Sequence, residues 1–449
     1  MIEAAPDSAD YAPDLRRIAL DFDPLEGVDL PVWDRKPCPT PLIPEFVDMP
    51  AGQHLYAVMD GARRGAVLGT NDLDCLDEDL GAVPLFDTGG AEDVQGPWLI
   101  DLGREGVARD RFLADFFAQF SGTRQGIFLR SAADAGELRA HLRGLLKVAR
   151  GDAEEPRDFL RYWDPMVAAV LMDQAVMRPK RLERLCFSRS GAAIDWYVEE
   201  GAARFLHYHV GGDGPAMKAR GPVHLDAEDE AAFQGLAYVA LGGALAKWLF
   251  DAYPIGAPDA PRMDRIGRHL VAQGQRFGFG LKDEFSYLGH MSVHLGAWFF
   301  ETGLFAPVMA VLADDAKARH KPLRGAFSQA WAGSYLPVVA AARAEMLADP
   351  LLADGPFLDH EGVGDLFKRH LPGPAHGDLR PLWRKAMAHA RACDMPDELH
   401  PAAGLLTIFA GYRFYEDPLV CAGVLPDDPA AWQDVFSFVW NELKGESHG

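Results

Sequence analysis

The chain has 449 residues, 49% hydrophobic and 10% aromatic, so it can bury a substantial core and is long enough for two or three domains. Its net charge of −22 argues against a nucleic-acid partner, because most of the surface would repel phosphate. We expect no membrane span and no secretory signal, because no apolar run has the required length or position. The five cysteines are scattered without a CxxC pair, which favours a reducing cytoplasm over a disulfide framework.

Residues 1–50 contain nine prolines and an excess of acidic side chains. Prolines remove backbone donors and bias the preceding residues towards extended conformations. We therefore expect an extended arm in which DRKPCPTPLIPEF (34–46) is not helical. Its apolar side chains are expected to dock parts of the arm onto the rest of the protein; they are Trp33, Leu42, Ile43 and Phe46.

Residues 51–215 alternate strand and helix patterns. Four apolar runs predict strands at 54–60, 96–102, 126–131 and 158–163. Helical spacing predicts helices at 109–120, 134–150 and 165–176, with Ser131 as the cap of the second. A period of two around Glu200-Gly201 predicts a hairpin over 192–210. We expect an α/β domain whose sheet is mixed or mostly parallel, with flanking helices.

Residues 216–449 are expected to form an all-helical domain with an internal repeat. The copies lie near 269–325 and 385–443 and share the segments GAWFFE (296–301) and GYRFYE (411–416). Each segment follows an apolar helical run that begins near an Asp-Glu pair, and each leads into a second apolar run. The size of the unit is within the range of known helical repeats.

Two histidine pairs are candidates for a metal site. His290 and His294 are four residues apart, which places both rings on one face of a helix. The second copy of the repeat lacks both histidines, so the fold does not require them, and a polar contact surface is the favoured interpretation. His207 and His209 share one face of a strand. Used together, the four would make a metal-dependent hydrolase. No HExxH, GxSxG or phosphate-binding loop is present, so we expect neither catalysis nor a metal or other cofactor.

A basic stripe follows the helix predicted at 134–150. Arg139, Arg143, Lys147 and Arg150 recur at helical spacing. In so acidic a protein this stripe is a candidate site for an acidic partner segment. The alternative, which we favour, is a solvated face that pairs with the protein's own acids.

The ordered set HLYAVMDGAR, GPWLIDL, GIFLRSAADAGELRAHLRGLLKVA and DFLRYWDPMVAAVL resembles the domain-of-unknown-function 4123 family of type VI secretion gene clusters. The resemblance covers about residues 50–190, and the helical region resembles the C-terminal extension of many members. Its most characteristic element is RYWDP: Arg161, Tyr162, Trp163, Asp164 and Pro165. The family usually has an arginine after this proline, where this chain has Met166. Pro165 suits a first helical turn and Asp164 suits a cap, so cap and core roles are favoured over direct binding.

The resemblance implies an adaptor or chaperone that stays in the bacterial cytoplasm. Such a protein binds one cognate toxin effector and delivers it to the VgrG spike or its tip protein. The α/β domain would recognise the delivery machinery or the effector's trafficking segment, and the helical repeats would provide specificity. A secreted effector is a further alternative. The partner-binding candidates are Arg139, Arg143, Lys147, Arg161, Tyr162, Trp163, Asp164, His290 and His294.

Overall fold

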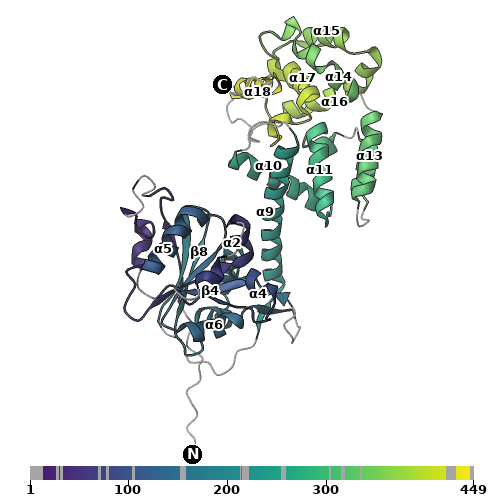
Figure 1. The fold of residues 1–449 in the computed structure, drawn as a ribbon. Coiled ribbons are helices and arrows are strands. Elements are labelled where there is room, and N and C mark those ends of the chain that lie inside the picture. The colour runs from purple at the N-terminus through teal and green to yellow at the C-terminus, as the bar shows by residue number, and fades with distance from the viewer. Residues whose placement is uncertain are drawn as a thin grey trace, which may run out of the picture. The chain divides into compact units, whose positions relative to one another are not determined.

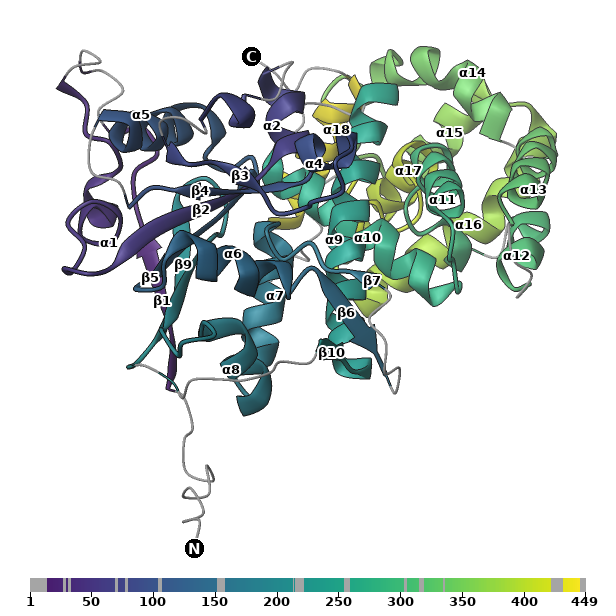
Figure 2. The same cartoon turned by 60° about the horizontal axis from the view of Figure 1, so that its bottom comes forward.

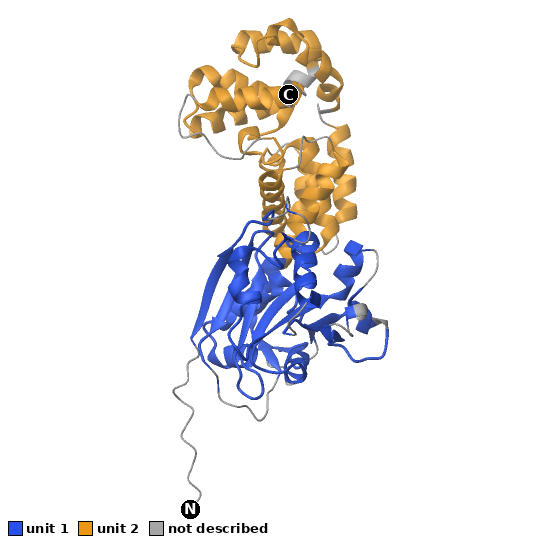
Figure 3. Ribbon diagram, turned by 60° about the vertical axis from the view of Figure 1, so that its left-hand side comes forward, with its two compact units in different colours: residues 1–236 blue, residues 237–449 orange. Residues whose placement is uncertain are grey.

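The protein is described here by a computed structural model. It describes residues 14–444 apart from gaps at 27–29, 31–33, 69–71, 77–79, 104–106, 152–157, 213, 215–221, 254–258, 303–304, 315–318, 334–335 and 421–430. Trp33 and part of the second repeat copy lie outside the described residues. The chain forms two compact units, unit 1 (Met1–Leu236) and unit 2 (Ala237–Gly449), which are coloured separately in Figure 3.

Unit 1 is built on a twisted sheet (Figure 1). The sheet has seven strands in the order β1-β9-β8-β5-β2-β4-β3. The strands are β1 (Leu15–Asp21), β2 (His54–Asp60), β3 (Val83–Pro84), β4 (Pro97–Asp101), β5 (Gly126–Ser131), β8 (Ile194–Glu199) and β9 (Arg204–Val210). Every neighbouring pair in this sheet is antiparallel. The α/β class and the hairpin formed by β8 and β9 are confirmed. The parallel pairing that we expected for this sheet is not observed.

The prediction of parallel strands failed because both faces of the sheet are buried. On β2, Tyr56 and Val58 belong to one core cluster, while Leu55, Ala57 and Met59 belong to another. Both sets of side chains are fully buried, so β2 is a continuous apolar run. Such runs are typical of parallel strands between two helical layers, and here an antiparallel strand has the same environment.

Helices cover both faces of the sheet. The helices of unit 1 are α1 (Ile43–Phe46), α2 (Gly61–Leu68), α4 (Ala91–Gln95), α5 (Val107–Asp115), α6 (Ala135–Arg143), α7 (Pro165–Ala175) and α8 (Pro179–Cys186). Side chains from α6, α7 and α8 pack in the core cluster that contains Tyr56. Side chains from α1 and α5 pack in the cluster that contains Leu55. The result is a three-layer α/β/α arrangement.

A smaller sheet, in the order β10-β6-β7, lies apart from the larger one (Figure 2). Its strands are β6 (Lys147–Arg150), β7 (Asp158–Phe159) and β10 (Val223–Leu225). β6 pairs with β10 in parallel and with β7 in antiparallel orientation. The single helix predicted at 134–150 is therefore wrong: α6 ends at Arg143, Gly144 follows as its C-cap, and the chain continues into β6. The cap at its start is also corrected, because Asp134, and not Ser131, accepts the Glu137 N–H, at 2.8 Å.

The N-terminal segment is less extended than its prolines predicted. β1 pairs with β9 at the edge of the larger sheet. Residues Thr40–Leu42 form a 3-10 turn that leads directly into α1, so the expectation that 34–46 contains no helix is wrong. Each of these helices has a proline in its first turn, where no N–H is needed. Leu42 and Phe46 are fully buried, which confirms their predicted docking.

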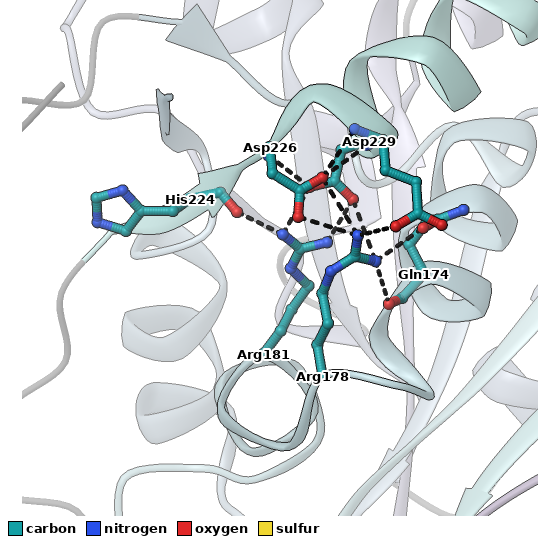
Figure 4. A network of polar contacts seen from close by, with 7 residues as sticks. Gln174, Arg178, Arg181, His224, Asp226 and Asp229 are labelled. Atoms are coloured by element: carbon teal, nitrogen blue, oxygen red, sulfur yellow. Dashed lines mark hydrogen bonds and ion pairs between the residues drawn. The ribbon is translucent and has the colours of Figure 1, made fainter. Parts of the chain in front are cut away.

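The first turn of α9 (Ala227–Ala252), which belongs to unit 1, is held by two arginines at the start of α8 (Figure 4). Arg181 Nη2 donates to Asp229 Oδ2 at 2.6 Å, and both side chains are almost fully buried. Arg178 directly precedes α8, and its Nη2 donates to Asp226 Oδ2 at 3.0 Å and to Glu228 Oε2 at 2.8 Å. Asp226 Oδ1 also accepts the Asp229 N–H at 3.0 Å, so the same acids cap the helix.

Unit 2 is helical throughout its described residues. After α9 come α10 (Ala260–Arg276), α11 (Lys282–Leu295), α12 (Ala306–Leu312), α13 (His320–Ala332), α14 (Leu336–Leu347), α15 (His360–His370), α16 (Gly373–Ala392), α17 (His400–Ala410) and α18 (Ala431–Lys444). Two core clusters divide it: one contains side chains of α10 to α13, and the other contains side chains of α14 to α18.

The two copies of the repeat share their local structure. The C-cap of α11 is Gly296, with φ 86°, and the C-cap of α17 is Gly411, with φ 99°. A 3-10 turn with the predicted Phe-aromatic-Glu sequence follows each glycine, at Phe299–Glu301 and Phe414–Glu416. The copies meet at the glycines, because a Cβ on Gly411 would lie 2.7 Å from Gly296 Cα.

Candidate functional site

The RYWDP motif forms a turn between β7 and α7. β7 ends at Phe159, and the Asp164 N–H donates to the Arg161 carbonyl oxygen at 2.9 Å. The Asp164 side chain accepts the Met166 N–H at 3.1 Å, and Pro165 occupies the first helical position. The predicted cap and proline roles are confirmed, whereas the predicted strand ends four residues early.

Asp60, at the end of β2, holds this turn through hydrogen bonds with its side chains. Its carboxylate is almost fully buried and accepts hydrogen bonds from Arg161 Nη2 at 2.6 Å and Trp163 Nε1 at 3.0 Å. Its Oδ1 accepts the Arg63 N–H at 3.0 Å, which caps α2. One buried acid therefore ties the start of α2 to the motif.

Asp164 gathers two further arginines. Arg63 Nη2 donates to its Oδ2 at 2.7 Å, and Arg124 Nη2 donates to its Oδ1 at 2.7 Å. The Asp164 side chain is 7% exposed, while those of Arg63 and Arg124 are 27% and 35% exposed. The buried acids thus fix three arginine side chains whose outer atoms reach solvent.

Tyr162 and Trp163 are both buried. We expected them to point to opposite faces of a strand, but a turn replaces the strand, and both rings enter the core. They contact each other edge to face at 5.5 Å, and Tyr162 also meets Trp196 at 6.0 Å. Burial raises the pKa of Tyr162 well above its usual value. Within the motif, Arg161 is therefore the residue exposed to a partner, with 53% of its side chain accessible.

The basic stripe is divided between a helix and a strand. Arg139 and Arg143 lie on α6, whereas Lys147 and Arg150 lie on β6, so their predicted helical alignment is wrong. Arg139 Nη2 donates to the Pro84 carbonyl at 3.0 Å. Arg143 pairs with Asp87 at 2.9 Å, and Arg150 pairs with Asp158 at 2.8 Å. The favoured interpretation, in which the stripe pairs with the protein's own acids, describes Arg143 and Arg150, whereas Arg139 bonds a backbone carbonyl.

Lys147 and Arg161 lie beside an exposed aromatic ring, that of Phe159. Lys147 Nζ is 5.7 Å from the ring centroid, and 63% of Phe159 is exposed. Phe159 separates two hollows. One, of about 750 Å³, is lined by Leu85, Phe86, Asp87, Thr88, Glu92, Arg143, Gly144, Leu146, Lys147, Phe159, Arg184 and Pro222. The other, of about 400 Å³, is lined by Val148, Arg150, Phe159, Leu160, Arg161, Val167, Leu225, Glu230, Phe233 and Gln234. We call these two hollows and the ring between them the Phe159 surface.

The backbone of β7 adds hydrogen-bonding groups to this surface. The Leu160 N–H donates to the Leu146 carbonyl at 2.9 Å. Because bonding alternates along an antiparallel strand, the N–H and C=O of Phe159 point away from β6. β7 ends the order of the smaller sheet among the described strands. The Phe159 surface therefore offers an aromatic anchor, cations and an open strand edge, which is the chemistry of strand addition by an extended peptide.

His207 and His209 meet a carboxylate on β8. Asp195 lies 3.3 Å from His207 Nε2 and 3.0 Å from His209 Nδ1, so three groups able to bind a metal converge. The same carboxylate pairs with Arg130 at 2.7 Å and accepts the Val210 N–H at 3.1 Å. Burial would raise the pKa of Asp195, but the adjacent His207 ring and the hydrogen bonds from Val210 and Arg130 hold it well below its usual value. Arg130 already supplies the positive charge that a metal ion would bring.

His290 and His294 lie together on α11 in unit 2. Their ring centroids are 4.7 Å apart, and His290 Nδ1 shares a hydrogen bond with the Tyr253 hydroxyl. Burial lowers the pKa of both histidines, so both are uncharged at neutral pH. Neither belongs to a group of three metal-binding side chains in the described part of the chain. His207 and His209 belong to unit 1, so the four-histidine site stays a hypothesis.

The structure contains a third cluster with a histidine, located in unit 2, which the sequence did not predict. His389, Cys393 and Glu416 place ligand atoms within 4.8 Å of one another. His389 Nδ1 lies 2.5 Å from the Tyr415 hydroxyl and 3.4 Å from Cys393 Sγ. The spacing of His389 and Cys393 by four residues on α16 was the available signal. Burial raises the pKa of the Cys393 thiol, which disfavours the thiolate that a metal would require.

A comparison with protein families assigns the central part of unit 1. Residues 55–181 match the family described as Domain of unknown function (DUF4123). The DUF4123 match begins in β2 and ends in α8, and it includes the RYWDP turn and most of the Phe159 surface. The predicted resemblance is thus confirmed for the domain. No curated protein and no solved structure matches the chain.

The sequence identified four residues of the Phe159 surface, Arg143, Lys147, Arg150 and Arg161. It did not identify Phe159 itself or the hydrogen bonds by which Asp60 holds the motif. Phe159 was assigned to a predicted strand, where an aromatic residue is ordinarily in the core. Its exposure depends on the small sheet, which pairs β6 with β7 and with a strand more than seventy residues later in the chain.

Among the described helices, none is both long and apolar enough to span a membrane.

Proposed function

We propose that this protein is a cytoplasmic adaptor-chaperone without enzymatic activity that binds a cognate type VI secretion toxin. It loads that toxin onto the VgrG spike or its tip protein. The observation that carries the proposal is the coincidence of the DUF4123 match with the Phe159 surface, which has the properties of a peptide-binding site. The role in secretion follows from the resemblance of the domain to a family found in type VI secretion gene clusters.

The Phe159 surface suits a segment that is extended before it binds. An incoming strand can pair with the outward N–H and C=O of Phe159, and its apolar side chains can fill the hollows on either side. Lys147, Arg143 and Arg161 favour a segment with acidic side chains. A toxin's unfolded trafficking region has the required conformation, and its capture would keep the toxin in a loadable state.

The test is copurification with the toxin encoded beside this gene. The full chain and the tagged toxin are produced together, and the complex is isolated through the toxin. We expect a stoichiometric complex that survives gel filtration and improves the yield of soluble toxin. A soluble toxin that never retains this protein would contradict the proposal.

The Asp195, His207 and His209 cluster favours one second candidate, a metal-dependent hydrolase. Metal analysis of the purified protein separates the two functions. A stoichiometric metal ion that is lost in His207→Ala and His209→Ala variants would support the hydrolase. Under the adaptor proposal, the same variants retain toxin binding.

A further inference from the structure

Unit 2 carries a group of aromatic rings that reaches the surface across three helices. Its members are in contact through ring centroids 4.7–6.1 Å apart; they are Trp248, Tyr253, His290, His294, Phe327 and Trp331. They come from α9 and the residue after it, from α11 and from α13. We call this group the aromatic face.

The aromatic face is not closed by the rest of unit 2. Trp248 is 37% exposed, whereas core rings of the same unit such as Phe299 are fully buried. A hollow of about 530 Å³ lies over it, lined by Trp248, Ser286, Tyr287, His290, Arg324, Phe327 and Ser328. The lining therefore includes a tryptophan, a tyrosine and an arginine. These residue types contribute most of the binding energy in protein–protein interfaces.

The charged side chains around this hollow are basic. Arg324 is exposed at its edge, and none of the described side chains that line it is acidic. Lys321 precedes Arg324 by three residues on α13 and so shares its side of the helix. Among the described residues, neither cation has an ion pair within 4.0 Å. In a chain with 66 acidic and 44 basic side chains, two such cations beside exposed rings are complementary to an acidic, apolar ligand.

We propose that the aromatic face is a second docking site, which binds a protein segment whose acidic side chains flank apolar or aromatic ones. The apolar side chains fill the hollow between Trp248 and Phe327, and a carboxylate pairs with Arg324. The Nε2 atom of His290 and the hydroxyl of Ser328 supply hydrogen bonds to the segment, since His290 Nδ1 is bonded to Tyr253 and the Ser286 hydroxyl donates to the Lys282 carbonyl. Nucleic acid does not fit, because two cations do not offset a net charge of −22. This site goes beyond the proposed function, since it lies in unit 2 and does not depend on the Phe159 surface.

The test is selection of random phage-displayed peptides on the full-length protein, with an Arg324→Glu variant as counter-selection. We expect selected peptides that place Asp or Glu beside Leu, Phe or Trp. Their affinity, measured by fluorescence polarisation, is expected to fall at least about tenfold in Arg324→Glu and in Trp248→Ser. The Phe159→Ser variant is expected to keep their affinity. The result for this site can therefore be distinguished from a failure of the proposed function.

Matched controls distinguish this site from general charge or stickiness. Arg391→Glu reverses an exposed arginine on α16, and Phe438→Ser removes a 47% exposed ring on α18; both are expected to leave affinity unchanged. Peptides without acidic bias, or equal binding by Arg324→Glu, would overturn the proposal. A wild-type dimer in sedimentation that Trp248→Ser dissociates would also overturn it, because a second copy would then cover the face.

Discussion

Asp60 and Asp164 show how single buried acids organise the surface that a partner would meet. Each accepts hydrogen bonds from arginines whose outer atoms remain in solvent. A buried carboxylate is costly unless it is fully bonded, so these arginines stabilise the fold as well as presenting charge. Of the two acids, Asp164 was predictable from its place before a helical proline. The contact of Asp60 with the motif was not, because Arg161 and Trp163 lie about a hundred residues away in the chain.

Replacing Asp164 by Asn removes the charge but retains a capping oxygen. We expect the free energy of unfolding to fall by about 2 kcal/mol, because Arg63 and Arg124 lose an almost buried partner. Urea denaturation measures the change. Asp158→Asn is the matched control: its side chain is 47% exposed, so the loss there should stay below about 0.5 kcal/mol. Equal effects of the two substitutions would refute the role given to Asp164.

Glu199 predicts a pH dependence of stability. Burial raises its pKa to about 7, although the Gly122 N–H, donating at 2.8 Å, favours the ionised form. The folded protein thus keeps a proton that the unfolded chain releases near pH 4.3, so this group's contribution to stability falls as pH rises from about 4 to 7. We expect Glu199→Gln to be about 2–3 kcal/mol more stable than wild type at pH 8 and similar to it near pH 4.5. Denaturation at several pH values measures this difference; a difference that does not vary with pH would contradict the assignment.

At the scale of elements, the first turn of α9 depends on a salt bridge that joins it to α8. Asp229→Asn leaves Arg181 buried without its counter-charge, so we expect a loss of about 3 kcal/mol. Hydrogen exchange of the first turns of α9 should accelerate in parallel. Glu228→Gln, whose side chain is 74% exposed in the same network, is the control and should change little. Unaltered exchange in Asp229→Asn would show that packing alone holds the helix.

The contact between the two repeat copies makes a second prediction about elements. Gly411→Ala forces a side chain into a residue with φ 99° and against Gly296, so we expect unit 2 to lose at least about 2 kcal/mol. Gly325→Ala is the control, because its helical site on α13 is open and alanine favours helix by about 1 kcal/mol. Thermal unfolding compares them. A Gly411→Ala protein as stable as Gly325→Ala would disprove the tight contact.

Element types were more predictable than element ends. The strands at 54–60 and 126–131 and the helix of Pro165 follow from period and capping. The helix predicted over 134–150 did not end where expected, because Leu142, Leu145 and Leu146 continue an apolar pattern past Gly144. Only the pairing of Lys147–Arg150 with β7 and β10 turns that pattern into a strand. Such pairing is tertiary and is not encoded in local spacing.

At the scale of the whole molecule, the order of an α/β region and a helical region followed from the change in period along the chain. The pairing direction of the larger sheet did not, because strands buried on both faces carry the same apolar pattern in either direction. The histidines were prominent in the sequence, but the Phe159 surface was not. Its residues come mainly from β6, β7, β10, the segment after β3, and the helices α4, α6, α7, α8 and α9, and folding brings them together.

The most direct test of the account is the affinity of the full chain for the toxin encoded beside it, measured by isothermal titration calorimetry. The combined substitutions Phe159→Ser and Lys147→Glu should weaken binding at least about tenfold, because they remove the exposed ring and reverse the adjacent charge. Met177→Ser, which removes an 85% exposed side chain elsewhere on unit 1, should leave the affinity unchanged. Equal affinities for wild type and the Phe159 and Lys147 variant would contradict the claim that the DUF4123 domain binds its partner through this surface.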